Sequence, residues 1–159
     1  MGGFWNNIGK RLRIYAGIAL SFGIVSFISD LRNVPLLIAP LAASACILFA
    51  VPDSPVARAK NIIFGHVISA SVGVIMHGSF GSNWLSNVIC VVIAVFLMDA
   101  AGVLHPPAAA TSLLALTTSQ GFSFVFMPVG TGALALVAAS MAAKRVIGCC
   151  FPNRHEPPE

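Results

Sequence analysis

Apolar residues make up most of the chain and gather in six runs separated by short polar or glycine-containing stretches. The runs cover residues 14–29, 34–51, 61–79, 84–98, 100–117 and 122–147. About 20 consecutive apolar residues form a helix long enough to cross the hydrocarbon core of a bilayer. The pattern therefore predicts an all-α fold, a polytopic membrane helical bundle.

Two of the six runs contain prolines that a continuous helix does not tolerate. Pro35 and Pro40 lie in the second run, and His105 is followed by Pro106 and Pro107 in the fifth. Proline removes a backbone hydrogen bond, and its ring clashes with the preceding turn. Both segments are expected to be Pro-interrupted or re-entrant. The chain then has either six full crossings, or four crossings with two re-entrant segments.

The composition limits the class of protein. Of the 159 residues, 57% are hydrophobic and 9% are charged, and the mean hydropathy is +0.90. A globular domain carries about 25% charged residues, so a soluble domain is excluded. The length leaves room for a single membrane domain over residues 1–159. Its first half is expected at about 14–79, its second half at about 84–147, and a flexible tail at 148–159.

The basic residues mark the ends of the chain. Residues 10–13 carry three of them and residues 144–154 carry three more. Cytoplasmic loops are enriched in Lys and Arg, so both termini are expected in the cytoplasm. Arg58 and Lys60 fall on the same side if there are six crossings. No basic groove suggests nucleic-acid binding.

The second half of the chain resembles the first when Pro40 is aligned with Pro106. Residues 40–50 then match residues 106–116. The same alignment places one series of small residues over another: Gly65, Ser69 and Gly73 over Thr131, Ala135 and Ala139. Small residues spaced by four allow close helix packing in membranes. These matches predict an internal 3+3 repeat with inverted halves, unless they only reflect two unrelated alanine-rich helices.

The sharpest local motif surrounds His105. Proline favours the first turn of a helix, so a helix is expected to begin near Pro107. The N–H groups of Ala108 and Ala109 then lack intrahelical partners and, with the positive end of the helix, form an anion site. His105 is placed to donate a hydrogen bond to the anion or to carry its proton. The predicted substrate-binding residues of this segment are His105, Pro106, Pro107, Ala108, Ala109 and Thr111.

The first half offers the same geometry, with a hydroxyl group added. Its predicted substrate-binding residues are Pro40, Ala42, Ala43 and Ser44. Paired proline-interrupted segments point to a binding site near the bilayer midplane, although such prolines also bend helices for packing alone. Asp99 and His66 are candidate proton-relay groups. The alternatives are a position at the membrane surface for Asp99 and a helix-packing role for His66.

A metal centre, a cofactor and an enzymatic activity have little support. His66 and His77 share a helix face but lie ~16 Å apart along its axis, too far to bind one metal ion. The chain contains no HExxH, CxxC, Walker or dinucleotide motif. We therefore expect neither an enzyme nor a bound cofactor.

The sequence resembles the HPP family of integral membrane proteins, named for the tripeptide that His105, Pro106 and Pro107 form here. Residues 37–55, residues 61–73 and Pro128 support the resemblance. It implies four transmembrane segments and, since members in chloroplasts and cyanobacteria are associated with nitrite transport, transport of a small anion. Ala108 and Ala109 differ from the family, where glycines are common, and Ala101-Gly102 replaces a frequent basic residue.

These observations predict a multi-pass membrane transport protein for a small inorganic anion, most simply nitrite. The expected partners are the lipid bilayer and the anion, with a homo-oligomer as an open possibility. The alternative is a non-transporting oligomeric scaffold or sensor module, held together by the small residues Gly65, Ser69 and Gly73.

Overall fold

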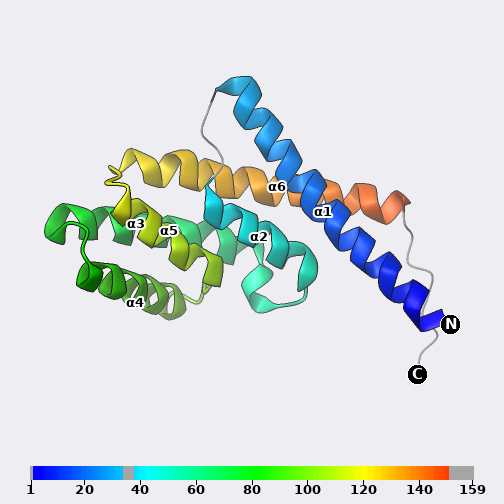
Figure 1. Ribbon diagram of the computed structural model, residues 1–159, viewed down its shortest axis with the longest axis horizontal. Coiled ribbons are helices and arrows are strands. Elements are labelled where there is room, and N and C mark those ends of the chain that lie inside the picture. Colours follow the sequence, from blue (N-terminus) through cyan, green and yellow to red (C-terminus); the bar gives the residue numbers. More distant parts are fainter. Residues whose placement is uncertain (1, 34–37, 151–159) are drawn as a thin grey trace.

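The computed structural model describes residues 2–33 and 38–150, which form a bundle of helices (Figure 1). The elements are α1 (Gly2–Arg32), α2 (Ala39–Ala50), the 3-10 turn η1 (Pro55–Ala57), α3 (Ala59–Phe80), α4 (Trp84–Ala100), α5 (Pro106–Thr117), the segment η2 (Val125–Gly130), which is kinked at the extended residue Met127, and α6 (Thr131–Cys150). No strand occurs in either described range. The prediction of an all-α membrane helical bundle is confirmed.

The helices fall into two length classes. Three apolar helical stretches are long enough to cross a membrane: Ile8–Leu31, Ala59–Phe80 and Val125–Cys149. Helix α4 is somewhat shorter, with 17 residues. Helices α2 and α5 have only 12 residues each, about 18 Å, against a hydrocarbon core of about 30 Å. Helix length therefore favours four crossings with two half-length segments over six full crossings.

Proline determines where the two half-length helices begin. Each has proline within its first two positions, where the missing N–H has no intrahelical partner to lose. The residues before them, Ile38 and His105, have extended backbones. Pro35, the other proline expected to interrupt the second segment, lies outside the described residues.

The turn before α4 shows why that helix begins where the apolar run begins. The Asn83 side chain accepts hydrogen bonds from the N–H groups of Leu85 and Ser86, both at 3.0 Å. The Ser86 hydroxyl in turn accepts from the Asn83 N–H at 2.9 Å, which completes a capping box. Gly81, at φ 65°, ends α3 just before this box. The two helices α3 and α4 are thus joined by a short, hydrogen-bonded turn.

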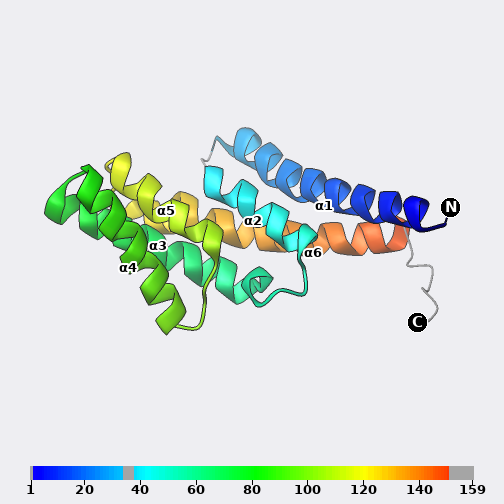
Figure 2. The ribbon, with the colours of Figure 1, turned by 60° about the horizontal axis from the view of Figure 1, so that its bottom comes forward.

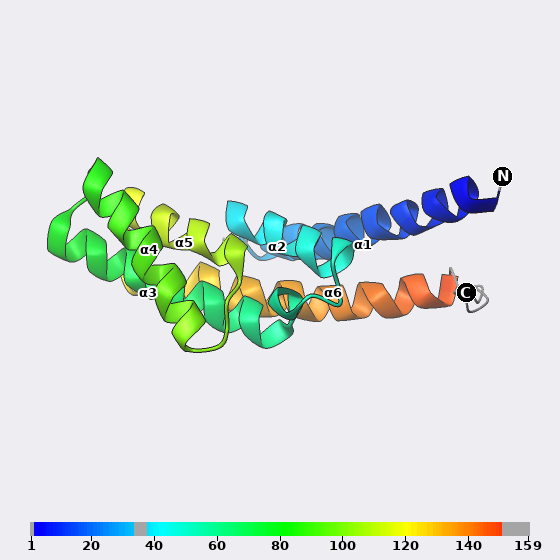
Figure 3. The same cartoon turned by 90° about the horizontal axis from the view of Figure 1, so that it is seen from below.

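The two half-length helices meet near the middle of the molecule. Figures 1 and 3 show α2 and α5 close together at their N-terminal ends and running toward opposite ends of the bundle. The N-terminal end of α1 and the C-terminal end of α6 lie together at one end (Figure 2). Helix α6 continues through Cys150, so residues 148–150, which were expected to belong to a flexible tail, are helical. The rest of the expected tail, residues 151–159, lies outside the described range.

The packing of the helices follows the predicted repeat. In this repeat α1 corresponds to α4, α2 to α5 and α3 to α6. When each helix is replaced by its counterpart, every packed pair of helices becomes a pair that is also packed. The pairs α1–α2, α1–α6 and α2–α6 become α4–α5, α4–α3 and α5–α3, while α2–α5 and α3–α6 map onto themselves. Corresponding helices run in opposite directions (Figure 3), as expected for an inverted repeat.

The boundaries of the elements keep the alignment that the sequence predicts. With Pro40 aligned with Pro106, the start of α3 at Ala59 coincides with the start of η2 at Val125. The starts of α2 at Ala39 and of α5 at Pro106 differ from this alignment by a single position. The sequence match therefore corresponds to a structural one.

The small residues of α3 are used inside the chain. A Cβ atom built on Gly73 would collide with the Ser112 carbonyl group and lie 2.7 Å from the Ala115 Cβ atom, both on α5. A Cβ atom on Gly65 would lie 3.0 Å from the His105 Cβ atom. These glycines bring the backbones of α3 and α5 together, so they are not available as the oligomer interface that the scaffold alternative requires.

Candidate functional site

Four buried polar side chains meet beside the N-terminal ends of α2 and α5. Ser44 comes from the second turn of α2, His66 from the middle of α3, His105 from the residue before α5, and Thr111 from α5 itself. Each of the four is 0% exposed. A buried polar group is costly unless it is hydrogen-bonded, so their partners determine whether the cluster is stable.

The four side chains form one continuous hydrogen-bonded network. The Ser44 Oγ atom lies 2.8 Å from His105 Nε2 and 2.9 Å from His66 Nε2. His66 Nδ1 lies 2.7 Å from the Thr111 Oγ1 atom, and His105 Nδ1 lies 2.8 Å from the Val56 carbonyl oxygen. The two imidazole centroids are 5.4 Å apart. One serine hydroxyl therefore connects two histidines from different segments of the chain.

The Val56 carbonyl fixes the direction of the hydrogen bonds, because a carbonyl oxygen only accepts. His105 must donate from Nδ1, so in its neutral form Nε2 accepts the Ser44 hydroxyl proton. Ser44 then accepts from His66 Nε2–H, and His66 Nδ1 accepts from the Thr111 hydroxyl. With both imidazoles neutral, each ring nitrogen has one partner and the hydrogen bonds all run from Thr111 toward Val56.

The segment before α5 is held in place by α3. The Asn61 side-chain amide donates to the Leu104 carbonyl at 2.9 Å, directly before His105. Gly65, one turn further along α3, has no side chain and leaves room for the His105 Cβ atom and the Val103 carbonyl. Asn61 and Gly65 therefore position the His105 backbone from one face of a single helix.

The structure places the predicted site residues at different depths. His105, Ser44, Thr111 and the proton-relay candidate His66 meet in the network described above. Of the remaining predicted residues, Pro40 and Ala108 are buried, Ala42, Pro107 and Ala109 are half-buried, and Ala43 and Pro106 are exposed. The inward-facing positions of both proline-initiated helices thus lie near the network, and the outward-facing positions do not.

The prediction that Ala108 presents a free N–H group is wrong. Its N–H donates to the His105 carbonyl at 2.9 Å, because the first turn of α5 closes tightly onto the residue before it. The N–H of Leu41 donates to the Ile38 carbonyl in the same way at the start of α2. The positive ends of the two helix dipoles remain directed at the site, but an anion must compete for the Ala108 N–H.

Asp99 lies apart from this cluster. Its side chain is exposed near the end of α4, where it lines a pocket of about 490 Å³ with Val95, Phe96 and Leu104. In the described part of the chain its side chain has no hydrogen bond to the histidine network. A proton-relay role for Asp99 remains a prediction, and no hydrogen bond among the described residues connects Asp99 to the histidines.

The repeat relates each residue of one half to a counterpart in the other half, but the counterparts of Ser44 and His66 are not polar. In the alignment of Pro40 with Pro106, Ser44 corresponds to Ala110 and His66 corresponds to Gly132. Neither counterpart carries a polar side chain. The polar groups are therefore a feature added to the repeated framework and not a requirement of its packing.

Two members of the site were not among the residues predicted from the sequence. The Val56 carbonyl is a backbone group in the short turn η1, and no side-chain pattern identifies it. Asn61 is one of the few polar residues in the apolar run of α3, and this is a usable but weak signal. Its partner Leu104 lies in the other half of the chain.

A family model described as "HPP, transmembrane region" matches residues 6–156. The chain belongs to the HPP family. The histidine that gives this family its name is the one bonded here to Ser44 and to the Val56 carbonyl. The resemblance predicted from three blocks of sequence is confirmed.

Relatives of this HPP protein include two from Dictyostelium discoideum, both described as transmembrane proteins. One is 41% identical over 122 residues, covering 69% of this chain and 43% of the relative. The other is 34% identical over 122 residues, covering 69% and 39%. The chain thus spans less than half the length of these relatives. No solved structure matches it.

Proposed function

We propose that this HPP protein transports a small monovalent inorganic anion, nitrite above all, across the membrane together with a proton. The observation that carries the proposal is the meeting of two helix N-termini at a buried pair of linked imidazoles. Helix N-termini favour negative charge, and histidine accepts or releases a proton near neutral pH. We propose a bacterial inner membrane as its location, with the basic ends of α1 and α6 in the cytoplasm.

The charge balance of the site supports coupled movement. The network consists of two imidazoles, two hydroxyls and a backbone carbonyl, and none of these groups carries a fixed charge. A lone anion or a lone proton would leave an uncompensated charge in a medium of low dielectric constant, at a cost of several kcal/mol. An anion and a proton that enter together leave the site neutral. We therefore infer that each anion is accompanied by one proton.

The network can accept that proton without leaving a donor unpaired. When His105 is protonated at Nε2, it donates to Ser44 instead of accepting from it. The Ser44 hydroxyl can then donate to the Pro40 carbonyl, 3.1 Å away, while it still accepts from His66. A single rotation of one hydroxyl thus converts the neutral network into its protonated form.

The inverted repeat supports a transport cycle. The four polar side chains are sealed from solvent, so a substrate reaches them only if helices around α2 and α5 separate. In transporters built from inverted repeats, the site lies at the junction of the halves, and each half can take the conformation of the other. The symmetric packing of α2 with α5 and of α3 with α6 supports such an exchange.

Nitrite uptake by the purified chain in liposomes tests the proposal. With an acidic exterior, nitrite and protons should both enter, at a rate that rises with the pH gradient and saturates with nitrite. Protein-free liposomes under the same gradient are the necessary control, because neutral nitrous acid can cross lipid unaided. Uptake no faster than in these liposomes would contradict transport, and saturable uptake without proton entry would contradict the coupling.

Replacement of Ser44 with alanine should slow this uptake about tenfold. The change leaves two buried ring nitrogens without a partner, and each unpaired group costs roughly 1–3 kcal/mol. A tenfold slower rate corresponds to about 1.4 kcal/mol. The matched control is Ser71→Ala, because among the described residues the Ser71 hydroxyl donates to the Val67 carbonyl of its own helix and not to the network. Equal uptake by the two variants would exclude a role for the serine link.

A further inference from the structure

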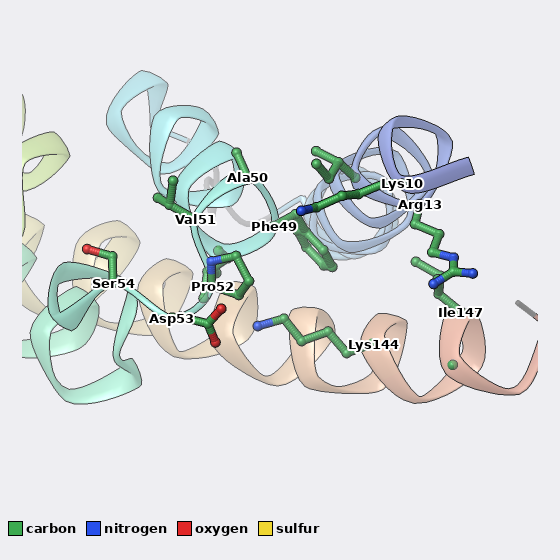
Figure 4. Close-up of a pocket in the computed structure, with 13 residues that line it drawn as sticks. Lys10, Arg13, Phe49, Ala50, Val51, Pro52, Asp53, Ser54, Lys144 and Ile147 are labelled. Carbon is green, nitrogen blue, oxygen red and sulfur yellow. The ribbon is translucent and has the colours of Figure 1, made fainter. Parts of the chain in front are cut away.

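A second hollow lies at the end of the bundle that holds both basic ends of the chain. It has a volume of about 740 Å³ and opens between α1, the turn after α2, and α6 (Figure 4). Lys10 and Arg13 line it from α1, Lys144 lines it from α6, and Asp53 lines it from the turn. Three cationic side chains and one carboxylate give this pocket an excess of positive charge.

The rest of the pocket wall is apolar. Ile14, Leu48, Phe49 and Ile147 are among the residues that line it. The Lys144 ammonium group lies 5.6 Å from the centre of the Phe49 ring, a cation–π distance that holds the charge over the apolar wall. The pocket therefore combines a charged part with a hydrophobic part, which a small hydrophilic anion does not need.

The cations lie where a membrane-spanning helix meets the lipid headgroups. Lys10 falls close to the start of the apolar stretch Ile8–Leu31, and Lys144 falls in the last part of Val125–Cys149. Lys and Arg near the ends of such helices place their charge at the membrane interface. We therefore expect the cations of the pocket at the depth of the lipid phosphate groups, with the apolar wall facing the acyl chains.

The repeat shows that the fold does not require these charges. At the opposite end of the bundle, the residues that correspond to Lys144 and Asp53 are Gly78 and Ser119. Corresponding pairs of helices pack at the two ends, but the charged side chains Lys144 and Asp53 occur at only one of them. This end carries the basic residues that the positive-inside rule places in the cytoplasm, facing the leaflet that is rich in anionic lipids.

We propose that the pocket binds the headgroup of an anionic phospholipid. The three cations would surround the phosphodiester, and the apolar wall would take the first part of an acyl chain. The Asp53 carboxylate can accept a hydrogen bond from a headgroup hydroxyl, which favours a glycerol headgroup over a purely anionic one. Basic pockets between transmembrane helices are known to suit such lipids. The proposal does not depend on the transported anion.

Lipid retention by the intact chain tests this assignment. The protein is reconstituted with equal amounts of phosphatidylglycerol and phosphatidylcholine of identical acyl chains, extracted in mild detergent, and weighed with its bound lipid by native mass spectrometry. Wild-type protein should retain phosphatidylglycerol preferentially. Lys144→Gln should retain about fivefold less, the effect of one basic side chain near an anionic headgroup.

The neighbouring residue provides the matched control. Arg145 follows Lys144 on the same helix but does not line the pocket, so Arg145→Gln should retain phosphatidylglycerol as the wild type does. Equal losses in the two variants, or no preference over phosphatidylcholine, would overturn the proposal. Lys144-dependent binding of glycerol 3-phosphate without retention of phosphatidylglycerol would identify a soluble phosphate as the ligand and exclude the lipid.

Discussion

Replacement of His105 with alanine is expected to reduce proton-driven nitrite uptake a hundredfold or more. The imidazole is proposed both to bind the anion and to carry its proton. A hydrogen bond to a charged group contributes about 1.5–3 kcal/mol, and its upper range alone corresponds to roughly a hundredfold in rate. Loss of the proton acceptor adds to this effect. The measurement is the initial rate of nitrite and proton entry into liposomes under an imposed pH gradient.

Two further variants separate chemistry from folding. His77→Ala removes a histidine from the same bundle that takes no part in the network, and its uptake should match that of the wild type. His105→Gln keeps a polar side chain of similar size next to Ser44 but cannot carry a proton. It should fold and insert normally and still lose proton entry. If His105→Gln transports protons and nitrite at the normal rate, His105 is not the proton carrier.

The hydrogen-bonded network also explains how the two halves of the chain are held together. Ser44 and His66 belong to the first half, whereas His105 and Thr111 belong to the second half. Every side-chain link in the network except the one between Ser44 and His66 crosses from one half to the other. Separation of the halves would therefore break bonds at the substrate site itself. An anion and a proton that replace those bonds would make opening and binding a single event.

Local chemistry made the framework predictable from the sequence. Proline before small residues fixes the start of a helix through its own backbone, so the beginnings of α2 and α5 could be placed without a structure. The alignment of Pro40 with Pro106 was visible because proline and small residues recur where helices pack closely. The helices end at Ala50 and Thr117, within one residue of the ends of their apolar runs, so proline and hydropathy together account for their length of 12 residues.

The arrangement of the site was less predictable, for physical reasons. Ser44, His66 and His105 were each identifiable as polar groups in apolar surroundings, but their meeting at one hydroxyl depends on contacts between segments far apart in the sequence. Asp99 is close to His105 in sequence, yet the turn after α4 leaves it exposed. The backbone carbonyl of Val56, which sets the tautomer of His105, has no signature in the sequence.

Replacement of Gly73 with alanine is expected to destabilise the protein by about 3 kcal/mol or more, the upper range for an overpacked core. The added methyl group would collide with the Ser112 carbonyl and lie 2.7 Å from the Ala115 Cβ atom. A backbone carbonyl cannot rotate away, so α3 and α5 must separate. The measurement is thermal unfolding of the purified protein in detergent, where the melting temperature should fall by several degrees.

Gly78 provides the control on the same helix, because a Cβ atom built there meets nothing within 4 Å. Gly78→Ala should be neutral or stabilise the helix by up to about 1 kcal/mol, since alanine is the better helix former. Similar melting temperatures for the two variants would show that α3 and α5 do not pack through Gly73. Separation of these helices would also lengthen the 2.7 Å contact between His66 and Thr111. Gly73→Ala protein that remains folded should therefore transport nitrite poorly, although Gly73 itself does not touch the site.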